Sequence, residues 1–259
     1  MTDLKGQGAL VTGSCIGLGA AIARRLSAAG AKVVVTGFPV DRGQALAKEI
    51  DGAFIAADLL KVDECRALVR QSIERLGRLD ILVNNAAVSE RATLEEVTPE
   101  MFDRQFHLIV RAPILLAQAA LAELKARTGV IVNIASVNSH VGWPNLLCYA
   151  AAKAALVNVT KNLANGLKYA RVRVHGVNPG WIDTEGERAM MEKLGHPKDF
   201  LEREGKRFPI KRLLKPEEVA DAVGWLVSSG AAAFSGVVCD LEQFPVTAMC
   251  HPEDTEPMQ

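Results

Sequence analysis

The sequence predicts an α/β fold: a single Rossmann-like, doubly wound parallel β-sheet with helices on both faces. Short apolar runs alternate with longer helix-like segments from the first residues to about residue 240. These runs are apolar throughout, which is typical of parallel strands buried on both faces. No repeat, low-complexity linker or change in composition marks a second domain, and 259 residues are enough for one substantial core.

The elements follow in order from these runs. The first strand is predicted at residues 9–12, and a helix at 18–29, ended by Gly30, follows it. KVVVT at 32–36 and LDILVN at 79–84 are two further strands. We also predict strands at 53–57, 130–134 and 172–177, and helices at 42–50, 62–76, 99–126 and 148–170.

The chain changes character after the last of these strands. Residues 179–215 are rich in charge, glycine and proline. A long insertion beyond the strand ends is a candidate substrate lid. We assign residues 1–245 to one domain that includes this lid. We expect the tail, 246–259, to be extended or poorly ordered.

Charge and cysteine content narrow the class of protein. Lys+Arg and Asp+Glu are equal at 30 each, so no basic excess attracts nucleic acid or an anionic membrane. Five scattered cysteines show neither a CxxC pair nor a metal-ligand spacing, which favours a reducing compartment and no metal site. The sequence shows no signal peptide and no apolar run of about 18 residues. We therefore expect a soluble, cytoplasmic protein.

A glycine-rich turn, TGSCIGLG, joins the first strand to the first helix. Glycines allow a tight turn and close approach to a pyrophosphate, whose charge lies at the helix N-terminus. The position between the first strand and first helix is the context that this mechanism requires. The turn predicts cofactor contacts from Gly13, Ser14, Cys15, Ile16, Gly17, Leu18 and Gly19.

In this turn and in later motifs, the sequence resembles the short-chain dehydrogenase/reductase family over about the first 240 residues. The TGxxxGxG spacing matches, Ser136 follows the fifth strand in VNIAS, and Tyr149-Ala-Ala-Ala-Lys153 matches YxxxK. NNAA at 84–87 resembles the family's NNAG, and NPG at 178–180 follows the sixth strand. The resemblance implies a homo-oligomer, tetramer or dimer. It also implies cofactor contacts from Asp58, Leu59, Asn85, Ala86, Tyr149, Lys153, Pro179, Gly180, Ile182 and Thr184.

Ser136, Tyr149 and Lys153 form the candidate catalytic group. Tyr149 and Lys153 are four residues apart on a helix and share one face. A free tyrosine has a pKa of about 10, and we expect Lys153 and an oxidised nicotinamide to lower it. Tyr149 then exchanges a proton with an alcohol or ketone substrate, and Ser136 hydrogen-bonds the substrate oxygen. The nicotinamide supplies the hydride chemistry. Loops that carry His140, Trp143, Asn145 and Trp181 flank the substrate or simply pack.

The choice between NAD and NADP stays open, with NAD favoured. Relatives that prefer NAD end the second strand with aspartate, where this chain has Gly37. The positions where NADP-dependent relatives carry a cation hold Phe38 and Ile16. Arg42 or Asp41 reaches the ribose, or else is a solvated charge at a helix start. A phosphate without a partner costs more than one lost diol contact, which favours NAD.

One departure supports a rival interpretation, a catalytically idle dinucleotide-binding sensor or scaffold subunit. Relatives carry an asparagine in the long fourth helix that helps to hold a water linked to the lysine, and Ile109 stands there. Pro113 has no N–H for the carbonyl of Ile109. We therefore predict a helix distorted near residues 109–113, with a water or the Lys153 amine near that carbonyl.

Overall fold

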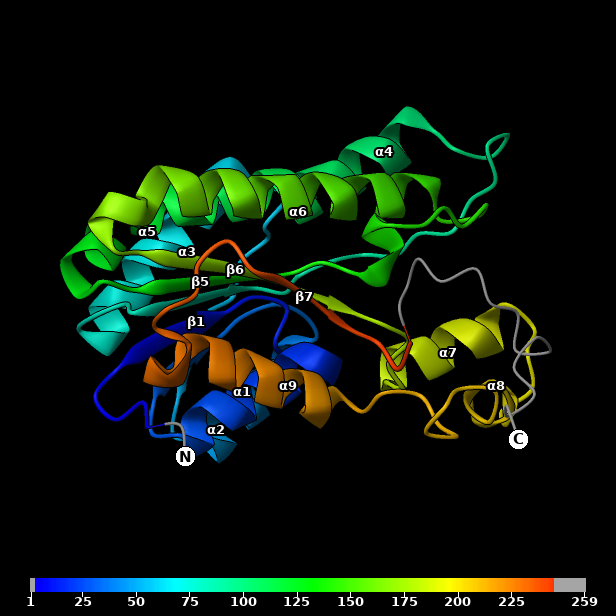
Figure 1. Ribbon diagram of the computed structural model, residues 1–259, viewed down its shortest axis with the longest axis horizontal. Helices are drawn as coiled ribbons and strands as arrows, with labels where there is room; N and C mark the ends of the chain where they lie inside the picture. Colours follow the sequence, from blue (N-terminus) through cyan, green and yellow to red (C-terminus); the bar gives the residue numbers. More distant parts are fainter. Residues whose placement is uncertain (1–2, 245–259) are drawn as a thin grey trace, which may run out of the picture.

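The computed structural model describes residues 3–244 and shows a seven-stranded sheet (Figure 1). The strand order is β3-β2-β1-β4-β5-β6-β7, and every neighbouring pair is parallel. The predicted fold class is confirmed, while the predicted tail, 246–259, lies outside the described residues. The strands are β1 (Gly8–Val11), β2 (Lys32–Val35), β3 (Ala53–Phe54), β4 (Ile81–Asn84), β5 (Val130–Ile134), β6 (Arg173–Pro179) and β7 (Val238–Leu241).

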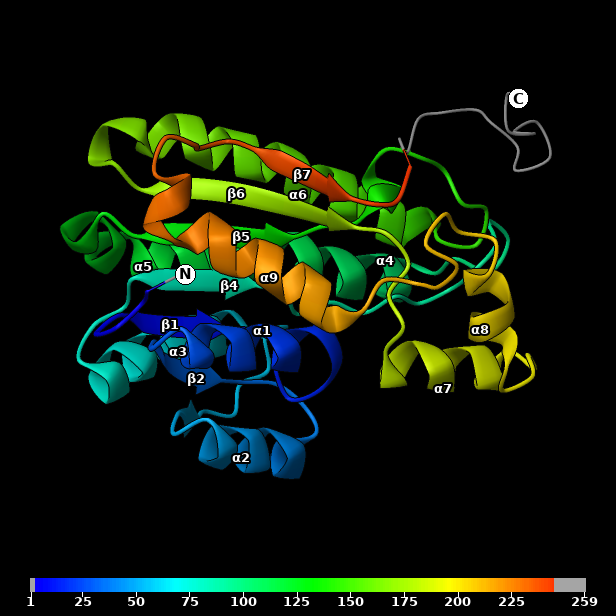
Figure 2. The same ribbon diagram turned by 60° about the horizontal axis from the view of Figure 1, so that its bottom comes forward.

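Helices cover both faces of the sheet (Figures 1 and 2). On one face lie α1 (Gly17–Ala28), α2 (Val40–Glu49) and α9 (Pro216–Val227). On the other lie α3 (Val62–Leu76), α4 (Pro99–Phe106), α5 (Ala112–Arg127) and α6 (Leu147–Leu167). Neither α9 nor β7 was predicted from the sequence. Short helical turns, η2 (Val137–Ser139), η3 (Lys168–Ala170) and η4 (Ser229–Ala231), complete the chain between them.

The apolar strands separate two packed layers. Successive side chains of a strand point to opposite faces. Val33 and Val35 accordingly pack in the core beneath α1 and α9, whereas Val34 packs in the core beneath α3 and α5. All three side chains are fully buried. Odd and even positions of such a strand each face one of the two cores, so a polar residue at any position would be buried. This is why these strands are apolar throughout.

The helix predicted at 99–126 is interrupted. A π-helical segment, η1 (His107–Arg111), separates α4 from α5, and the N–H of Ala112 donates to the carbonyl of His107 five residues back. Pro113 has no N–H to donate to the carbonyl of Ile109, so a regular α-helical ladder cannot continue through this turn. The predicted distortion is confirmed. The side chain of Ile109 is 1% exposed and packs among Ala135, Ala152 and Leu156.

By length and composition alone, the helical stretch Pro99–Arg127 would qualify as a membrane span. In the structure it covers one face of the sheet (Figure 1), with Leu116 and Leu124 buried in the core that it shares with α3. Its packing as a core helix accounts for its apolar composition.

The predicted lid, 179–215, lies beyond the carboxyl ends of the strands (Figure 2). It contains two helices that the sequence interpretation missed, α7 (Glu185–Lys193) and α8 (Phe200–Gly205). Two backbone hydrogen bonds join its ends: Leu214 N–H donates to the Trp181 carbonyl at 3.0 Å, and Asp183 N–H donates to the Leu214 carbonyl at 2.9 Å. The segment has its own apolar cluster of Met191, Leu201 and Leu213.

Candidate active site

The glycine turn between β1 and α1 has the predicted conformation. Gly13 and Gly17 have positive φ angles of 61° and 57°, which glycine adopts without strain. A Cβ atom on Gly19 would lie 2.2 Å from the carbonyl oxygen of Gly13 and 2.5 Å from the amide nitrogen of Asn85. The first turn of α1 therefore folds back onto the turn before it, and only glycine fits at this contact.

Thr12 ties the end of β4 to this turn. Its hydroxyl accepts the N–H groups of Asn85 at 2.9 Å and Ala86 at 3.1 Å. The Asn85 side chain donates to the carbonyls of Thr12 at 2.9 Å and Gly13 at 3.0 Å. A Cβ on Gly13 would lie 2.8 Å from the Cα of Ala86. The structure thus brings Asn85 and Ala86 to the glycine turn, as we expected for cofactor-binding residues.

Ser14 and Cys15 face inward. The Ser14 hydroxyl donates to the Val11 carbonyl at 2.6 Å and accepts the Thr36 N–H at 3.1 Å, which holds the turn against the end of β2. Cys15 is 4% exposed, and burial raises the pKa of its thiol to about 11. Both side chains shape the turn from within, so their contribution to a cofactor site is limited to the backbone.

Asp58 and Leu59 follow β3. The Asp58 carboxylate accepts the N–H of Leu60 at 3.0 Å and remains 35% exposed. The side chain of Leu59 is buried in the core beneath α3 and α5. Asp58 therefore keeps an exposed face for the adenine contact that the resemblance implies, whereas the Leu59 side chain points to the core.

The residues after β6 lead into the lid and pass close to the glycine turn. Pro179 ends β6, and the Gly180 N–H donates to the Leu241 carbonyl of β7 at 2.8 Å. Ile182 packs against the core beneath α1 and α9. Thr184 caps α7, and its Cβ would lie 3.8 Å from a Cβ built on Gly17. Thr184 thus lies close to the turn, as expected.

Ser136, Tyr149 and Lys153 meet at the carboxyl end of β5. Ser136 follows β5, while the other two lie in the first two turns of α6. A polar contact with the Ser136 side chain lowers the pKa of the Tyr149 phenol. Lys153 is 2% exposed, its Nζ atom donates to the Ile134 carbonyl at 2.7 Å, and it lies 5.5 Å from the Tyr149 ring centroid.

Burial has the largest effect on the charges of this pair. It raises the pKa of Tyr149 to about 12 and lowers that of Lys153 to about 7. We expected Lys153 to lower the pKa of Tyr149. In the protein without cofactor this expectation is wrong, because the pKa of Tyr149 is raised. Lys153 is almost fully buried and Tyr149 is partly buried, and the loss of water favours the neutral amine and the neutral phenol.

A chain of buried side-chain hydrogen bonds, which the sequence interpretation missed, anchors α6. The Asn84 amide donates to the Asn133 side-chain oxygen at 2.8 Å, and the Asn133 amide donates to the Thr160 hydroxyl at 2.9 Å. Thr160 donates in turn to the Leu156 carbonyl at 2.8 Å. These bonds link β4, β5 and α6. Only the polar residues inside otherwise apolar strands signalled them in the sequence.

A second missed group surrounds the mouth of the site. Arg91, in the loop after β4, pairs with Glu187 of α7 at 3.3 Å, and Trp181 donates to the same carboxylate at 2.9 Å. The charges of Arg91 and Glu187 both act on the pKa of Tyr149. Among the flanking loop residues that we considered, Trp181 and Asn145 belong to this region, and Trp143 is 57% exposed. His140 instead contacts Asp240 at 2.9 Å, at the edge of the sheet.

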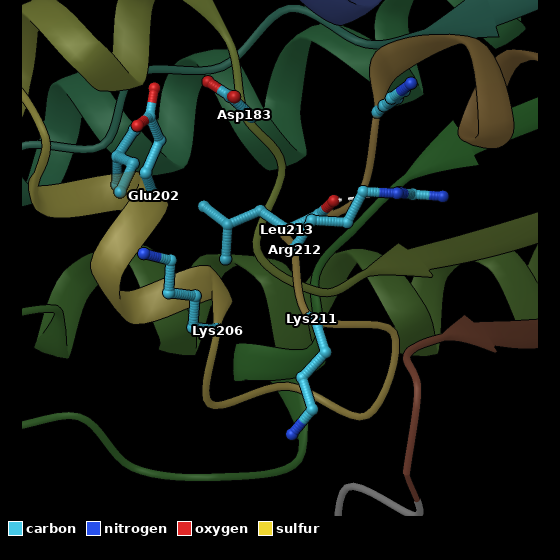
Figure 3. A pocket seen from close by; sticks show the side chains of 8 residues that line it. Asp183, Glu202, Lys206, Lys211, Arg212 and Leu213 are labelled. Carbon is cyan, nitrogen blue, oxygen red and sulfur yellow. Dashed lines mark hydrogen bonds between the residues drawn. The ribbon is translucent and has the colours of Figure 1, made fainter.

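Two cavities lie near the lid. One, of about 290 Å³, borders the glycine turn between Cys15, Ile16, Gly17, Arg42 and Glu185. The other, of about 270 Å³, is separate from the catalytic group, because it lies between α8 and the loop before α9 (Figure 3). It is lined by Asp183, Leu201, Glu202, Lys206, Lys211, Arg212, Leu213 and Lys215.

Comparisons with known proteins agree with the fold. A family model described as enoyl-(acyl carrier protein) reductase matches residues 13–241. The 4-formylbenzenesulfonate dehydrogenase of Comamonas testosteroni is 38% identical, over 93% of this chain and 98% of that protein. The structure of L-sorbose reductase from Gluconobacter frateurii, complexed with NADPH and L-sorbose, aligns with a TM-score of 0.88 at 28% identity, covering 96% and 99% of the two chains. That of 3-ketoacyl-(acyl-carrier-protein) reductase from Brucella melitensis, complexed with NADH, aligns with a TM-score of 0.83 at 33% identity, covering 92% and 97%.

The chain belongs to the short-chain dehydrogenase/reductase family. It is accordingly an NAD(P)-dependent oxidoreductase. Its glycine turn fits such a cofactor, because side chains at Gly13 and Gly19 would fill the cradle that Asn85 and Ala86 close. In this short-chain dehydrogenase/reductase, the turn and Thr184 lie next to each other, and the resemblance implies that both contact the dinucleotide.

Gly19→Ala tests this cradle. The added methyl group meets the Gly13 carbonyl and the Asn85 amide, so the turn must open. We expect the affinity for NAD(H) or NADP(H), measured by fluorescence titration, to fall by about tenfold or more, or about 1.4 kcal/mol. Gly166→Ala on α6, where a Cβ atom meets no other atom within 4 Å, is the control. Unchanged affinity in Gly19→Ala would contradict the assignment.

Lys153→Met tests the buried amine of this short-chain dehydrogenase/reductase through pH-dependent stability. Because burial lowers the pKa of Lys153 from 10.5 to about 7, the unfolded chain binds more protons than the folded protein between these values. The wild-type free energy of unfolding therefore gains from this group as pH rises through that window, by roughly 2–5 kcal/mol. Urea unfolding of both proteins without added cofactor measures it. Parallel pH profiles would show that the amine is not buried as a neutral group.

Proposed function

We propose that this protein interconverts a secondary alcohol and a ketone by hydride transfer with NAD(P). The observation that carries the proposal is the meeting of Ser136, Tyr149 and Lys153 at the carboxyl end of β5, where ligands bind in open α/β sheets. The substrate that fits this proposal is small and polar or alicyclic.

Each residue has a distinct part in the proposed reaction. A bound NAD(P) supplies the hydride donor or acceptor. Ser136, whose side chain lowers the pKa of Tyr149, orients the substrate oxygen toward the phenol. Tyr149 is protonated at neutral pH because burial raises its pKa to about 12, so it is ready to donate a proton to a ketone oxygen. Lys153 has a pKa of about 7 and is therefore suited to exchange protons near neutral pH.

The alternative function is a catalytically idle dinucleotide-binding sensor or scaffold subunit. The observation that favours it is Ile109, whose buried side chain cannot take part in a proton relay. The π-helical segment favours the enzyme. It interrupts the regular α-helical hydrogen bonds around Ile109, whose backbone carbonyl would hold the water of the proton relay. A water or the Lys153 amine near the Ile109 carbonyl remains our expectation. In the structure this amine donates to Ile134.

We further propose a cytoplasmic homo-oligomer, tetrameric or dimeric, that does not bind nucleic acid or membranes. The described cysteines, Cys15, Cys65, Cys148 and Cys239, are free thiols, which suits a reducing compartment. Phe102, Ile114 and Leu147 are exposed apolar side chains on the long helices α4, α5 and α6. Such a surface favours contact with a second copy of the chain.

Tyr149→Phe tests the proposed reaction. It removes the proton-transferring hydroxyl and almost no volume, so we expect oxidoreduction to be abolished while cofactor binding stays nearly intact. Turnover is measured with both cofactors across a panel of alcohols and ketones. The only other tyrosine, Tyr169, is 92% exposed, so Tyr169→Phe is a matched control. If Tyr149→Phe kept more than about a tenth of wild-type kcat, a cost under roughly 1.4 kcal/mol, the role of Tyr149 would be wrong.

Cofactor selectivity is expected to be weak, with NAD moderately preferred. The nearby cations already have carboxylate partners: Arg42 pairs with Glu185 at 3.2 Å and Arg24 with Glu49 at 2.6 Å. A 2′-phosphate would therefore have to compete for Arg42. Fluorescence titration of NADH and NADPH measures the preference. A preference for NADPH by about a hundredfold, or about 2.7 kcal/mol, would reverse the assignment and make Arg42 the first residue to mutate.

The lid is expected to open and close over the substrate. A few side-chain contacts, among them the Arg42–Glu185 and Arg91–Glu187 pairs, join it to the rest of the domain. We predict low hydrogen-exchange protection of residues 179–215 in the protein alone, and a gain when cofactor and substrate are both present. Peptides from α1 serve as the protected reference. Strong protection of the segment without ligands would show that it is not a lid.

A further inference from the structure

The loop that follows β4 carries Arg91 and lies next to the segment that leads into α6, the helix of Tyr149. The N–H of Ala92 donates to the Asn145 carbonyl at 3.0 Å, which joins this loop to the segment immediately before α6. The positive charge of Arg91 lowers the pKa of Tyr149, and the negative charge of Glu187 raises it. A substrate whose oxygen meets Tyr149 therefore has the rest of its surface near these two charges.

The guanidinium of Arg91 uses little of its hydrogen-bonding capacity. Its Nη2 atom makes one contact of 3.3 Å with Glu187, and its Nε atom is buried without a partner. The Glu187 oxygen in this contact is shared with the indole N–H of Trp181 at 2.9 Å. In Arg104 and Arg188, by contrast, Nε and Nη2 together bind one carboxylate at distances between 2.5 and 2.8 Å.

An acid group with two free oxygens would complete the bonding of Arg91. A buried N–H without a partner is unfavourable, and the Nε–Nη2 edge of a guanidinium matches two oxygens of one acid group. Exchange of the Glu187 carboxylate for a substrate acid group leaves Arg91 paired, so no unpaired charge is buried. Glu187 can separate from Arg91 without unfolding the site, because it lies on α7 in the lid and is 23% exposed.

We propose that Arg91 binds a carboxylate or sulfonate group of the substrate, and that Glu187 occupies this position until the substrate arrives. This inference rests on the proposed function, because it assigns a substrate class to the same site: small alcohols and ketones that carry an acid group. Arg91 is then a specificity-determining residue that contacts substrate but not the reacting oxygen.

Binding of simple acids tests the inference without any need for turnover. The probes are benzoate, benzenesulfonate and the uncharged benzamide, titrated by calorimetry into the protein saturated with reduced cofactor. We expect wild type to bind at least one of the two acids about tenfold more tightly than benzamide. Arg91→Ala should lose this preference, whereas Arg127→Ala, an exposed arginine at the far end of α5, should keep it. The two acids show whether the group preferred is a carboxylate or a sulfonate.

Glu187→Gln separates substrate recognition from a purely structural contact between loop and lid. Without the competing carboxylate, acid binding should tighten by about threefold or more. Equal or weaker binding in this variant would contradict the exchange. Equal affinity for acids and benzamide, or no measurable binding of the acids, would overturn the role of Arg91. Tyr149→Phe should bind the acids as wild type does, so a failure of the proposed reaction is distinguishable from a failure of this inference.

Discussion

The buried hydrogen-bond chain from Asn84 through Asn133 to Thr160 is the constraint on which the site depends. Apolar contacts between strands and a helix of Ala, Leu and Val tolerate small sliding movements, whereas buried amide groups must keep their partners. The chain fixes α6 relative to β4 and β5. Lys153 adds a bond to Ile134 on the same strand. Tyr149 is therefore placed relative to the glycine turn by polar contacts rather than by shape alone.

Burial then decides the chemistry of the group so placed. Tyr149 and Lys153 lose water together, and each shifts toward its neutral form. A neutral pair costs less to bury than an ion pair, and it leaves the phenol protonated. In the reaction that we propose, this group would therefore act first as an acid, and its action as a base would require positive charge from outside the pair.

Much of the fold was predictable, because its causes are local. The β-branched runs, the glycine turn and the four-residue spacing of Tyr149 and Lys153 each act within a few residues. The π-helical segment was predictable as well, since Pro113 removes one N–H. The lid helices were missed because their apolar cluster forms between Met191, Leu201 and Leu213, across a stretch broken by glycine and proline. The contact between Arg91 and Glu187 joins a loop to a helix ninety-six residues further along the chain, and no local pattern reports it. The direction of the Tyr149 pKa was wrong because the depth of burial does not appear in a motif.

The first turn of α7 spans the point where the strand order reverses, between β1 and β4. Through Glu185 it holds α2, on the β2 side of this crevice, and through Glu187 it holds the loop after β4 on the other side. The Arg42–Glu185 pair is exposed at 55% and 70%, whereas Arg91 and Glu187 are exposed at only 19% and 23%. Ionic strength screens the first pair far more than the second. Added salt should therefore loosen the contact of this turn with α2 before its contact with the loop after β4. A dinucleotide bound under this turn would then dissociate faster as salt is added. This couples the residence time of the cofactor to the ionic composition of the medium.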